Sequence, residues 1–388
     1  MQALVVDAKW QPKDEYPITE CEVEKQRANI GSLVWKDPVF EVRDVPMPII
    51  GHDEILIKVK RCGICGSDTH LYETSEDGYV IFSGPVKLPC VIGHEYSGIV
   101  VEKGKSVQLF NVGDKVAAES IYWCGICTAC RSGNLNQCEH VELTGVTTDG
   151  AMAEYARAKE RHCWSINAFS ENYDDEEAFE IGALIEPVGC AYNGIFIGGG
   201  GFKPGANVAI YGVGPIGLAA VALTKLAGAN KIIAFDVSNE RLAIAKKLGA
   251  DYVYNIDNLK KDGVLPSYVV LKLTAGGGAD INIEAAGAAN FTIPEMEHSM
   301  AVNGKIIYLG RAETVAPILL NTFVSGANSI VGVRGHSGYG IYNNIIRLMA
   351  SKRLDLRDVI TSHFDLSDVL GAIKKSTDRK DGKILVRF

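Results

Sequence analysis

The chain has 388 residues, more than one hydrophobic core usually holds, so two domains are expected. Hydrophobic residues at 47% and charged residues at 22% are ordinary for a globular protein and do not indicate disorder. The formal net charge of -8, without clustered Lys and Arg, argues against a nucleic-acid or anionic-membrane binder and favours a small-molecule partner.

Neither a signal peptide nor a membrane span is expected. The first ten residues, MQALVVDAKW, have no basic segment followed by a long apolar core. The longest apolar run follows Tyr211 and meets Lys225 before the roughly 18 residues that a membrane helix needs. A cytoplasmic location is therefore expected.

The first half of the chain has the pattern of short strands separated by turns. Apolar and polar residues alternate in short runs, with Gly and Pro between them. Strands are expected at residues 1–6, 32–35, 40–45, 54–61, 97–104, 113–120 and 151–157. The polar stretch 7–30 is expected to be a surface excursion, to which no function is assigned. The regular spacing of the strands predicts a compact β-barrel-like domain.

After residue 207 apolar strands alternate with helices. Strands are expected at 207–211, 231–236, 279–284, 305–310 and 329–333, and helices at 215–227 and 239–248. This alternation predicts a parallel, doubly wound sheet. Two further helices (342–351 and 366–376) and a last strand (383–387) are expected beyond it.

Metal-binding residue types gather in the first half. Cys65, His94 and a carboxylate, either Glu95 or Glu186, supply thiolate, imidazole and oxygen. A mixed set of this kind is typical of a catalytic Zn²⁺ site that keeps a position open for water or substrate. Taken alone, Cys62 and Cys65 would more often be two buried thiols or a redox pair. The GHE and LIEP motifs that accompany them favour zinc.

A second cluster consists of cysteines alone, in a loop rich in Gly, Thr, Ser and Asn. Its members are Cys124, Cys127, Cys130 and Cys138, with the spacing C-x2-C-x2-C-x7-C. Four thiolates close a tetrahedron around Zn²⁺ and leave no place for substrate, which predicts a structural zinc site. An iron-sulfur cluster is the competing use of four cysteines.

A glycine-rich turn joins an expected strand to an expected helix. The sequence YGVGPIG at 211–217 fits G-x-G-x-x-G, completed by Pro215 and Ile216. At such a turn Gly212 permits the tight bend, Gly214 lets a pyrophosphate approach the backbone, and Gly217 lets the helix pack on the strand. The turn predicts a dinucleotide site.

An acidic residue ends the next expected strand. There the carboxylate of Asp236 would accept hydrogen bonds from the ribose hydroxyls and repel a 2′-phosphate, which favours NAD over NADP. Arg241 either flanks the adenine or softens that discrimination. An exposed turn residue at the strand end is the structural alternative for Asp236.

Together these motifs resemble the zinc-containing medium-chain dehydrogenase/reductase family, which includes alcohol and sorbitol dehydrogenases. The resemblance covers essentially the whole chain and rests on CGICGSD, GHEYSGIVVEKG, the four-cysteine loop, LIEP and YGVGPIG. It implies an α/β fold with a GroES-like β-barrel catalytic domain in residues 1–189. A Rossmann NAD-binding domain would follow in 190–338, and a C-terminal segment, 339–388, would return to the catalytic domain.

The resemblance also implies how the metal is held. Cys65, His94 and Glu95 would bind the catalytic zinc, with Glu186 bound directly or through the zinc water. Alcohol dehydrogenases have a cysteine at the position of Glu186, so the departure points to the polyol, butanediol and threonine branch. Cys190 is a possible substitute ligand or a buried thiol. Two zinc ions per chain are expected.

Further residues match the family's proton relay. Ser67 corresponds to the hydroxyl that accepts the substrate proton, and His70 corresponds to the solvent end of the relay. Asp68 is expected to orient His94, because a ligating imidazole usually donates its second N–H to a carboxylate or carbonyl.

The implied function is zinc-dependent hydride transfer from a secondary hydroxyl of a polyol or cyclitol to NAD, with an inosose such as scyllo-inosose as the first choice of substrate. Alternatives are 2,3-butanediol or L-threonine 3-dehydrogenation, and, from another class, a non-catalytic NAD- and zinc-binding regulatory protein. Candidate pocket residues are Tyr72, Asn193, Arg334 and His336. A homodimer or homotetramer is expected, as in other members of the family.

Overall fold

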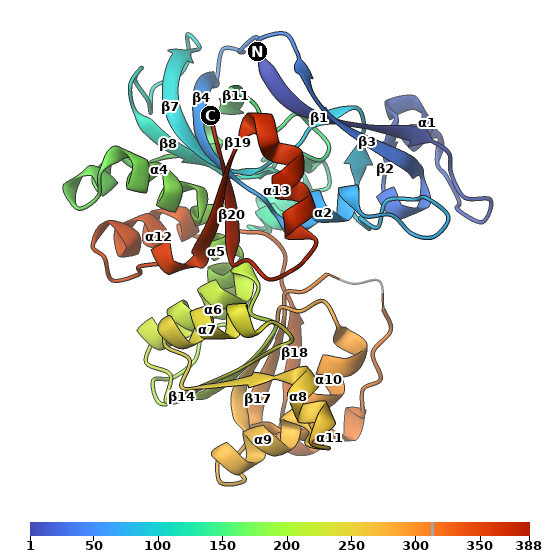
Figure 1. Cartoon of the computed structure of the whole chain (residues 1–388), viewed down its shortest axis with the longest axis vertical. Coiled ribbons are helices and arrows are strands. Elements are labelled where there is room, and N and C mark those ends of the chain that lie inside the picture. The colour runs from blue at the N-terminus through green and yellow to red at the C-terminus, as the bar shows by residue number, and fades with distance from the viewer. Residues whose placement is uncertain (312–313) are drawn as a thin grey trace.

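The computed structural model describes residues 1–311 and 314–388. Its chain forms two bodies, each built on its own sheet system (Figure 1). The N-terminal body contains a seven-stranded and a three-stranded sheet, and the parallel-sheet body contains six strands.

In the N-terminal body the seven-stranded sheet has the order β12-β8-β7-β4-β20-β19, and β11 also pairs with β4. The strands are β4 (Glu54–Gly63), β7 (Glu95–Lys103), β8 (Lys115–Ala118), β11 (Tyr155–Lys159), β12 (Cys163–Ser165), β19 (Ile360–Asp365) and β20 (Lys383–Arg387). Two strands from the end of the chain therefore complete a sheet that the first half begins.

A three-stranded sheet, β3-β1-β6, and two short pairs, β2-β5 and β9-β10, accompany it. Their bounds are β1 (Gln2–Trp10), β2 (Arg27–Ala28), β3 (Trp35–Asp44), β5 (Val86–Lys87), β6 (Cys90–Val91), β9 (Ile121–Tyr122) and β10 (Glu142–Leu143). Alternate residues of β4, such as Ile55, Ile57 and Val59, are fully buried, as a strand with one face on a core requires.

The parallel-sheet body has the strand order β15-β14-β13-β16-β17-β18, and each pairing is parallel. The strands are β13 (Asn207–Tyr211), β14 (Lys231–Asp236), β15 (Tyr252–Asn255), β16 (Ala279–Glu284), β17 (Met300–Tyr308) and β18 (Ser329–Gly332). The helices are α6 (Pro215–Leu226), α7 (Asn239–Lys247), α8 (Ile256–Lys261), α9 (Pro266–Leu273), α10 (Ala289–His298) and α11 (Leu320–Gly326).

Residues of β13 alternate between two cores. Val208 and Ile210 pack with apolar residues of α6 and α7, whereas Ala209 and Tyr211 pack with those of α9 and α10. Helices thus cover both faces of the sheet, which confirms the expected doubly wound architecture.

Helix α5 (Ile185–Tyr192) lies where the two bodies meet. It follows α4 (Asp175–Ala183), continues as a π-helical turn over Asn193–Gly198, and contacts α6 and α12 (Ile341–Ala350). The other helices are α1 (Glu20–Lys25), α2 (Gly66–Tyr72), α3 (Thr128–Arg131) and α13 (Val369–Ser376). Because α5 belongs to the same core as β13 and α6, residues at its start have fixed positions relative to the parallel sheet.

Several sequence predictions of local structure were wrong. Residues 32–35 do not form a separate strand, because a 3₁₀ turn at Gly31–Leu33 precedes a single long strand, β3. The stretch 7–30 is more ordered than a surface excursion: β1 extends to Trp10, and α1 begins with a Thr19–Glu22 capping box. Strands β15 and β19 and helices α8 to α11 were not predicted. The division at residues 189 and 338 stays a prediction.

Among residues 1–311 and 314–388, no single helix is long and apolar enough to cross a membrane. The bent pair Asp175–Ala183 and Ile185–Gly198 meets the requirement by length and composition only.

Candidate active site

Three of the predicted zinc ligands lie together. Cys65 precedes α2, and His94 and Glu95 stand where the chain enters β7. Their ligand atoms all lie within 4.8 Å of one another, with His94 and Glu95 buried and Cys65 half-buried. The group offers one sulfur, one nitrogen and one oxygen donor, a set that suits Zn²⁺.

The two nitrogens of His94 face different partners. Nε2 lies 3.5 Å from Ser67 Oγ, and Nδ1 lies 4.0 Å from Asp68 Oδ1, longer than a hydrogen bond. Neither His94 Nδ1 nor Asp68 Oδ1 has a hydrogen-bond partner in the described part of the chain. The other Asp68 oxygen accepts from the backbone N–H of Cys65 at 2.9 Å, so Asp68 caps α2 and faces the imidazole at once.

The electrostatics of this group suit a cation. Burial lowers the pKa of His94, but the negative charges of Cys65, Asp68 and Glu186 outweigh burial and raise the pKa well above its ordinary value. A site whose anionic groups stabilise a positive charge also fits a bound Zn²⁺.

Lys383, from the last strand, completes the group. Its ammonium is fully buried, forms an ion pair with Glu95 Oε2, and donates to the carbonyl of Ile64 at 2.9 Å. Burial lowers the pKa of Lys383, but the charges of Glu95 and Cys65 outweigh it and raise the pKa. Gly63 makes room for the pair, since a Cβ there would lie 2.3 Å from Glu95 Oε2. Lys383 thus reduces the net negative charge that the donor set alone would present.

Glu186 lies outside the three-residue group. Its Oε1 accepts from Ser120 Oγ at 2.8 Å and lies 3.0 Å from His336 Nε2. Burial raises the pKa of Glu186, but His336 and His94 outweigh burial and lower the pKa to about 2. The carboxylate is therefore charged and already engaged by protein groups.

The predicted relay residues share one face of α2. Ser67 and His70 are three residues apart, which places both side chains on one side of the helix. No hydrogen bond joins them directly within the described residues. Both are half-buried, and burial followed by the charge of Arg379 lowers the pKa of His70. A neutral imidazole at neutral pH suits an acceptor of protons.

The candidate pocket residues have different surroundings. His336 reaches Glu186, whereas Asn193 donates to the carbonyls of Arg334 and Gly335 at 3.2 and 2.8 Å and so holds that segment. Arg334 Nη2 is buried without a partner among the described residues. Tyr72 is 37% exposed and packs edge-on against Phe40.

Two other cysteines belong to the surroundings of the group. Cys62 is fully buried, with its sulfur directed to the carbonyl of Gly63. Cys190 does not belong to the three-residue group, and burial together with Glu186 raises the pKa of its thiol. Both environments favour the neutral thiol over a thiolate ligand.

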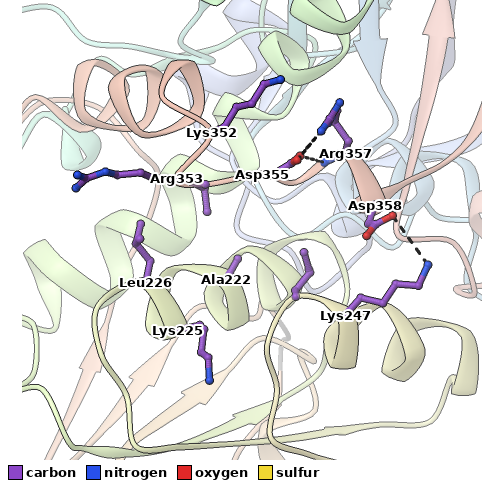
Figure 2. A pocket seen from close by; sticks show the side chains of 11 residues that line it. Ala222, Lys225, Leu226, Lys247, Lys352, Arg353, Asp355, Arg357 and Asp358 are labelled. Carbon is purple, nitrogen blue, oxygen red and sulfur yellow. Dashed lines mark hydrogen bonds and ion pairs between the residues drawn. The ribbon is translucent and has the colours of Figure 1, made fainter. Parts of the chain in front are cut away.

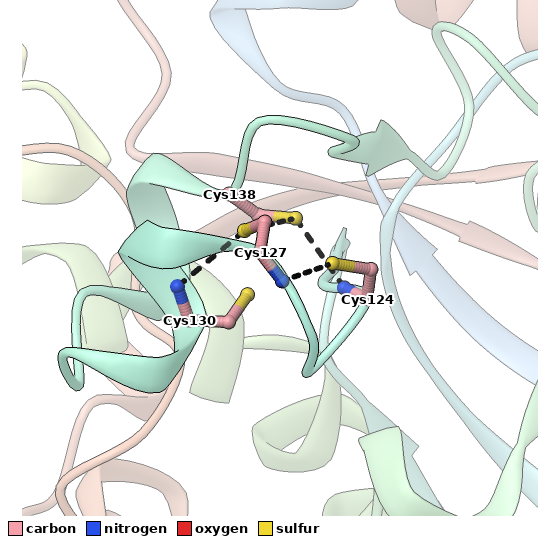
Figure 3. A group of neighbouring side chains, drawn as sticks. All are labelled: Cys124, Cys127, Cys130 and Cys138. Atoms are coloured by element: carbon pink, nitrogen blue, oxygen red, sulfur yellow. Dashed lines mark hydrogen bonds between the residues drawn. The ribbon is translucent and has the colours of Figure 1, made fainter.

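The four-cysteine loop closes on a common centre. Figure 3 shows the four side chains turned toward one another around α3, and their sulfur atoms all lie within 4.8 Å. The Cys127 and Cys138 sulfurs are 3.9 Å apart, close to the edge of about 3.8 Å expected for a tetrahedron with Zn–S bonds of about 2.3 Å. Backbone N–H donors lower the pKa of Cys127 to about 6, which favours its thiolate, whereas burial raises the pKa of Cys130 and of Cys138 in the absence of a metal.

The glycine-rich turn has the geometry that a dinucleotide needs. Gly212 has a φ of +87°, and a Cβ on Gly217 would lie 2.0 Å from the Gly212 carbonyl oxygen. By contrast, a Cβ on Gly214 would approach only the Arg241 guanidinium, at 3.6 Å. Pro215 and Ile216 begin α6, whose N-terminus opens beside Gly214. The open side of Gly214 is suited to a phosphate at the helix N-terminus.

Asp236 forms two hydrogen bonds with the backbone. Its two oxygens accept from the backbone N–H groups of Val213 and Ser238 at 2.7 and 2.8 Å. Arg241 donates to the carbonyl of Asp381 at 2.8 Å, which links α7 to the segment before β20. The carboxylate thus ties the glycine turn to the end of β14, where both elements would meet an adenosine ribose.

A large open cavity lies elsewhere. It measures about 610 Å³, lies between the C-terminal ends of α6 and α7 and the segment 352–358, and has charged walls. Figure 2 shows that Lys225 and Lys352 point apart, while Lys247 pairs with Asp358 at 3.9 Å. Because its cations diverge or are paired, this cavity does not form a centre for chemistry.

Sequence reasoning missed Lys383 and Ser120. Neither belongs to a recognisable motif. A lysine at the start of the apolar strand KILVR was the only available signal for Lys383.

Comparisons with known proteins agree with this arrangement. Residues 51–168 match the alcohol dehydrogenase GroES-like domain and residues 215–351 match the zinc-binding dehydrogenase domain. The chain is 38% identical to scyllo-inosose 3-dehydrogenase of Thermotoga maritima over 99% of both chains. It is 34% identical to L-threonine 3-dehydrogenase of Bacillus velezensis over 89% of this chain and 94% of that one. A solved Thermotoga maritima structure with 38% identity covers 100% of both chains with a TM-score of 0.94. The predicted combination of a GroES-like and a Rossmann fold is confirmed, and the chain belongs to the zinc-containing medium-chain dehydrogenases, which are oxidoreductases.

Proposed function

We propose that this enzyme oxidises a secondary hydroxyl of a polyol or cyclitol with NAD, and that an inosose such as scyllo-inosose is the substrate. The observation that carries the proposal is the 38% identity, over 99% of both chains, to a relative named scyllo-inosose 3-dehydrogenase. The carboxylate of Glu186, which is close enough for its charge to raise the pKa of His94, supports a substrate with more than one hydroxyl.

Cys65, His94 and Glu95 would hold the catalytic zinc, and the four cysteines of the loop would hold the structural zinc. When bound, the catalytic ion supplies a positive charge that lowers the pKa of a substrate hydroxyl. Asp68 orients His94, and Lys383 holds Glu95 in place through the buried ion pair.

Ser67 accepts the hydroxyl proton, because its Oγ lies beside His94 Nε2 at the donor group. His70, one turn further along α2, passes the proton to solvent. Ser67 and His70 lie one turn apart on α2 without a direct hydrogen bond, so the proton would need a further hydroxyl group or water to pass from one to the other. Glu186 accepts a hydrogen bond from a second hydroxyl and so favours polyols over simple alcohols.

The coenzyme would lie along the glycine turn, residues 212–217, with its ribose at Asp236. The carboxylate there favours NAD, since a 2′-phosphate would meet a like charge. Arg241, beside Gly214, offers a positive charge to the pyrophosphate.

The test is NADH formation by the purified protein, followed by absorbance, with NAD or NADP and six candidate substrates. The panel contains scyllo-inosose, myo-inositol, sorbitol, 2,3-butanediol, L-threonine and ethanol. Reduction of NAD with a cyclitol or polyol supports the proposal. Activity confined to L-threonine, the substrate in the name of another relative, or to butanediol would replace the substrate. Coenzyme and zinc binding without turnover of any hydroxyl compound would favour a regulatory protein instead.

The assembly is proposed to be a homodimer or homotetramer. Among the described strands, β18 pairs with β17 alone and so ends the six-stranded sheet, and α11, which precedes β18 in the chain, has no buried residue. Large apolar side chains are exposed there, among them Leu320, Val324 and Ile330. Exposed apolar side chains beside an open sheet edge suit contact with a second copy. Light scattering on the purified protein tests it, and a monomer would contradict the proposal.

A further inference from the structure

A histidine from the parallel-sheet body reaches the active-site carboxylate. His336 lies in the segment after β18, is buried, and places Nε2 3.0 Å from Glu186 Oε1 and 2.9 Å from Ser120 Oγ. Ser120 donates to the same Oε1 at 2.8 Å. Within the described residues Glu186 Oε2 has no hydrogen-bond partner. One oxygen of the carboxylate is therefore held, and the other is left for a ligand.

The approach of His336 to Glu186 depends on two glycines. Gly189 lies one helical turn after Glu186 on α5, and a Cβ there would lie 2.7 Å from His336 Cβ. Gly335 has a φ of +73°, and a Cβ there would lie 2.2 Å from Ile121 Cδ1. A larger residue at position 189 would push His336 away from α5, and one at position 335 would collide with Ile121 and Asn136 and displace the backbone next to His336, so both glycines permit this contact.

The four-cysteine loop holds the same segment from the other side. Asn136, between Cys130 and Cys138, donates through Nδ2 to the Ser337 carbonyl at 3.1 Å and accepts from the Ser337 N–H at 2.9 Å. Asn136 is itself buried. This paired contact fixes the backbone next to His336, and therefore connects the cysteine loop with the active-site carboxylate.

We propose that His336 is a positioning residue for Glu186 and that the cysteine loop keeps His336 in place through Asn136. With Ser120, His336 engages Oε1 and leaves Oε2 as the acceptor for the second hydroxyl of a polyol. The inference rests on the proposed function and adds a residue that determines specificity. It also gives the four-cysteine loop a task in substrate recognition.

The kinetic test compares His336→Ala with His336→Gln, whose amide nitrogen can take the place of Nε2. Removing a group that orients an active-site residue commonly costs about 10- to 100-fold in activity. His336→Ala is expected to lower kcat/KM for the polyol by that amount and to affect a simple secondary alcohol less. His336→Gln is expected to recover most of the loss. The proposal would be overturned if His336→Ala lowered kcat/KM equally for the polyol and for the simple alcohol. It would also be overturned if His336→Gln lowered kcat/KM as much as His336→Ala does.

A second readout does not depend on turnover. In protein loaded with Co²⁺, His336→Ala leaves Ser120 as the single described group on Glu186 Oε1, so the less restrained carboxylate should change its position relative to the metal and alter the visible spectrum while the metal content stays at two per chain. His336→Gln should keep the wild-type spectrum. Asn136→Ala should reproduce the change in weaker form, and it serves as the test should His336→Ala not fold. Unchanged spectra in His336→Ala and Asn136→Ala would refute the positioning role.

The two readouts separate this inference from the proposed function. If the wild-type protein oxidises no polyol, the proposed function fails. The Co²⁺ spectra would still decide whether His336 positions Glu186.

Discussion

Replacing Lys383 by methionine removes a buried cation and keeps the length of the side chain. The ammonium is 1% exposed and has two partners, Glu95 Oε2 and the Ile64 carbonyl, so Lys383→Met leaves both oxygens buried without a donor. Breaking one side of a buried ion pair commonly costs about 3–5 kcal/mol. Unfolding entropy scales to about 0.8 kcal/mol/K for a chain of this size, so Tm should fall by about 4–6 °C if the chain unfolds as a unit.

The assay is thermal unfolding of zinc-depleted and zinc-loaded protein, with Glu95→Gln and the double variant Glu95→Gln/Lys383→Met beside it. A bound ion would compensate the Glu95 carboxylate, so the loss should be larger in the zinc-depleted protein. The double variant removes both charges and should be less destabilised than the sum of the single variants. A zinc-depleted Lys383→Met protein with the wild-type Tm, or purely additive losses, would refute the account of this pair.

Three further predictions concern the other sites. Cys124→Ser should lower the zinc content, measured by elemental analysis, from two to one per chain, because the remaining three thiolates no longer close the tetrahedron. Two zinc ions per chain in that variant would contradict the assignment of the four cysteines to a structural zinc. Gly214→Ala has room for its methyl group, so this variant should keep the wild-type Tm and bind NADH more weakly, as measured by fluorescence titration. In the matched variant Gly217→Ala the added methyl group would lie 2.0 Å from the Gly212 carbonyl oxygen, so Tm should fall. Equal Tm values for the two would be evidence against the close packing. Asp236→Asn should reduce the preference for NAD over NADP by roughly 10- to 100-fold, since hydrogen bonds to a charged group contribute about 1.5–3 kcal/mol. An unchanged ratio of kcat/KM values would show that another residue selects the coenzyme.

Predictions from short spacings agreed well with the structure. The four cysteines lie within one loop, and the residues of the glycine turn are consecutive, so local geometry nearly determines where their side chains lie. Cys65 and His94 were placed through motifs whose backbone conformation is local as well. The alternation of strands and helices after residue 207 was sufficient to predict the parallel sheet, because each crossover helix carries its own apolar periodicity.

Predictions failed where the outcome depends on contacts between distant segments. Lys383 and Glu95 are 288 residues apart, and Ser120 and His336 are 216 residues apart. The sequence around these residues does not indicate that either pair is in contact. Whether Glu186 binds zinc directly or through the zinc water stays a prediction, and the contacts of its Oε1 with Ser120 and His336 come from segments that no motif connects to it. The short strand β15 was missed because its residues are only partly buried and lack a clear alternation.

These distant contacts have a consequence for how the active site forms. The donor group of Cys65, His94 and Glu95 belongs to the N-terminal body. Lys383, which pairs with Glu95, comes from the last strand, and His336, which contacts Glu186, comes from the segment after β18. Helix α5 carries Glu186 at its start and packs on α6, which begins at the glycine turn. A shift of the parallel-sheet body therefore moves His336 and α6 together relative to the donor group. Coenzyme bound at the N-terminus of α6 and substrate held by Glu186, as proposed above, would therefore both contact the packed pair α5 and α6.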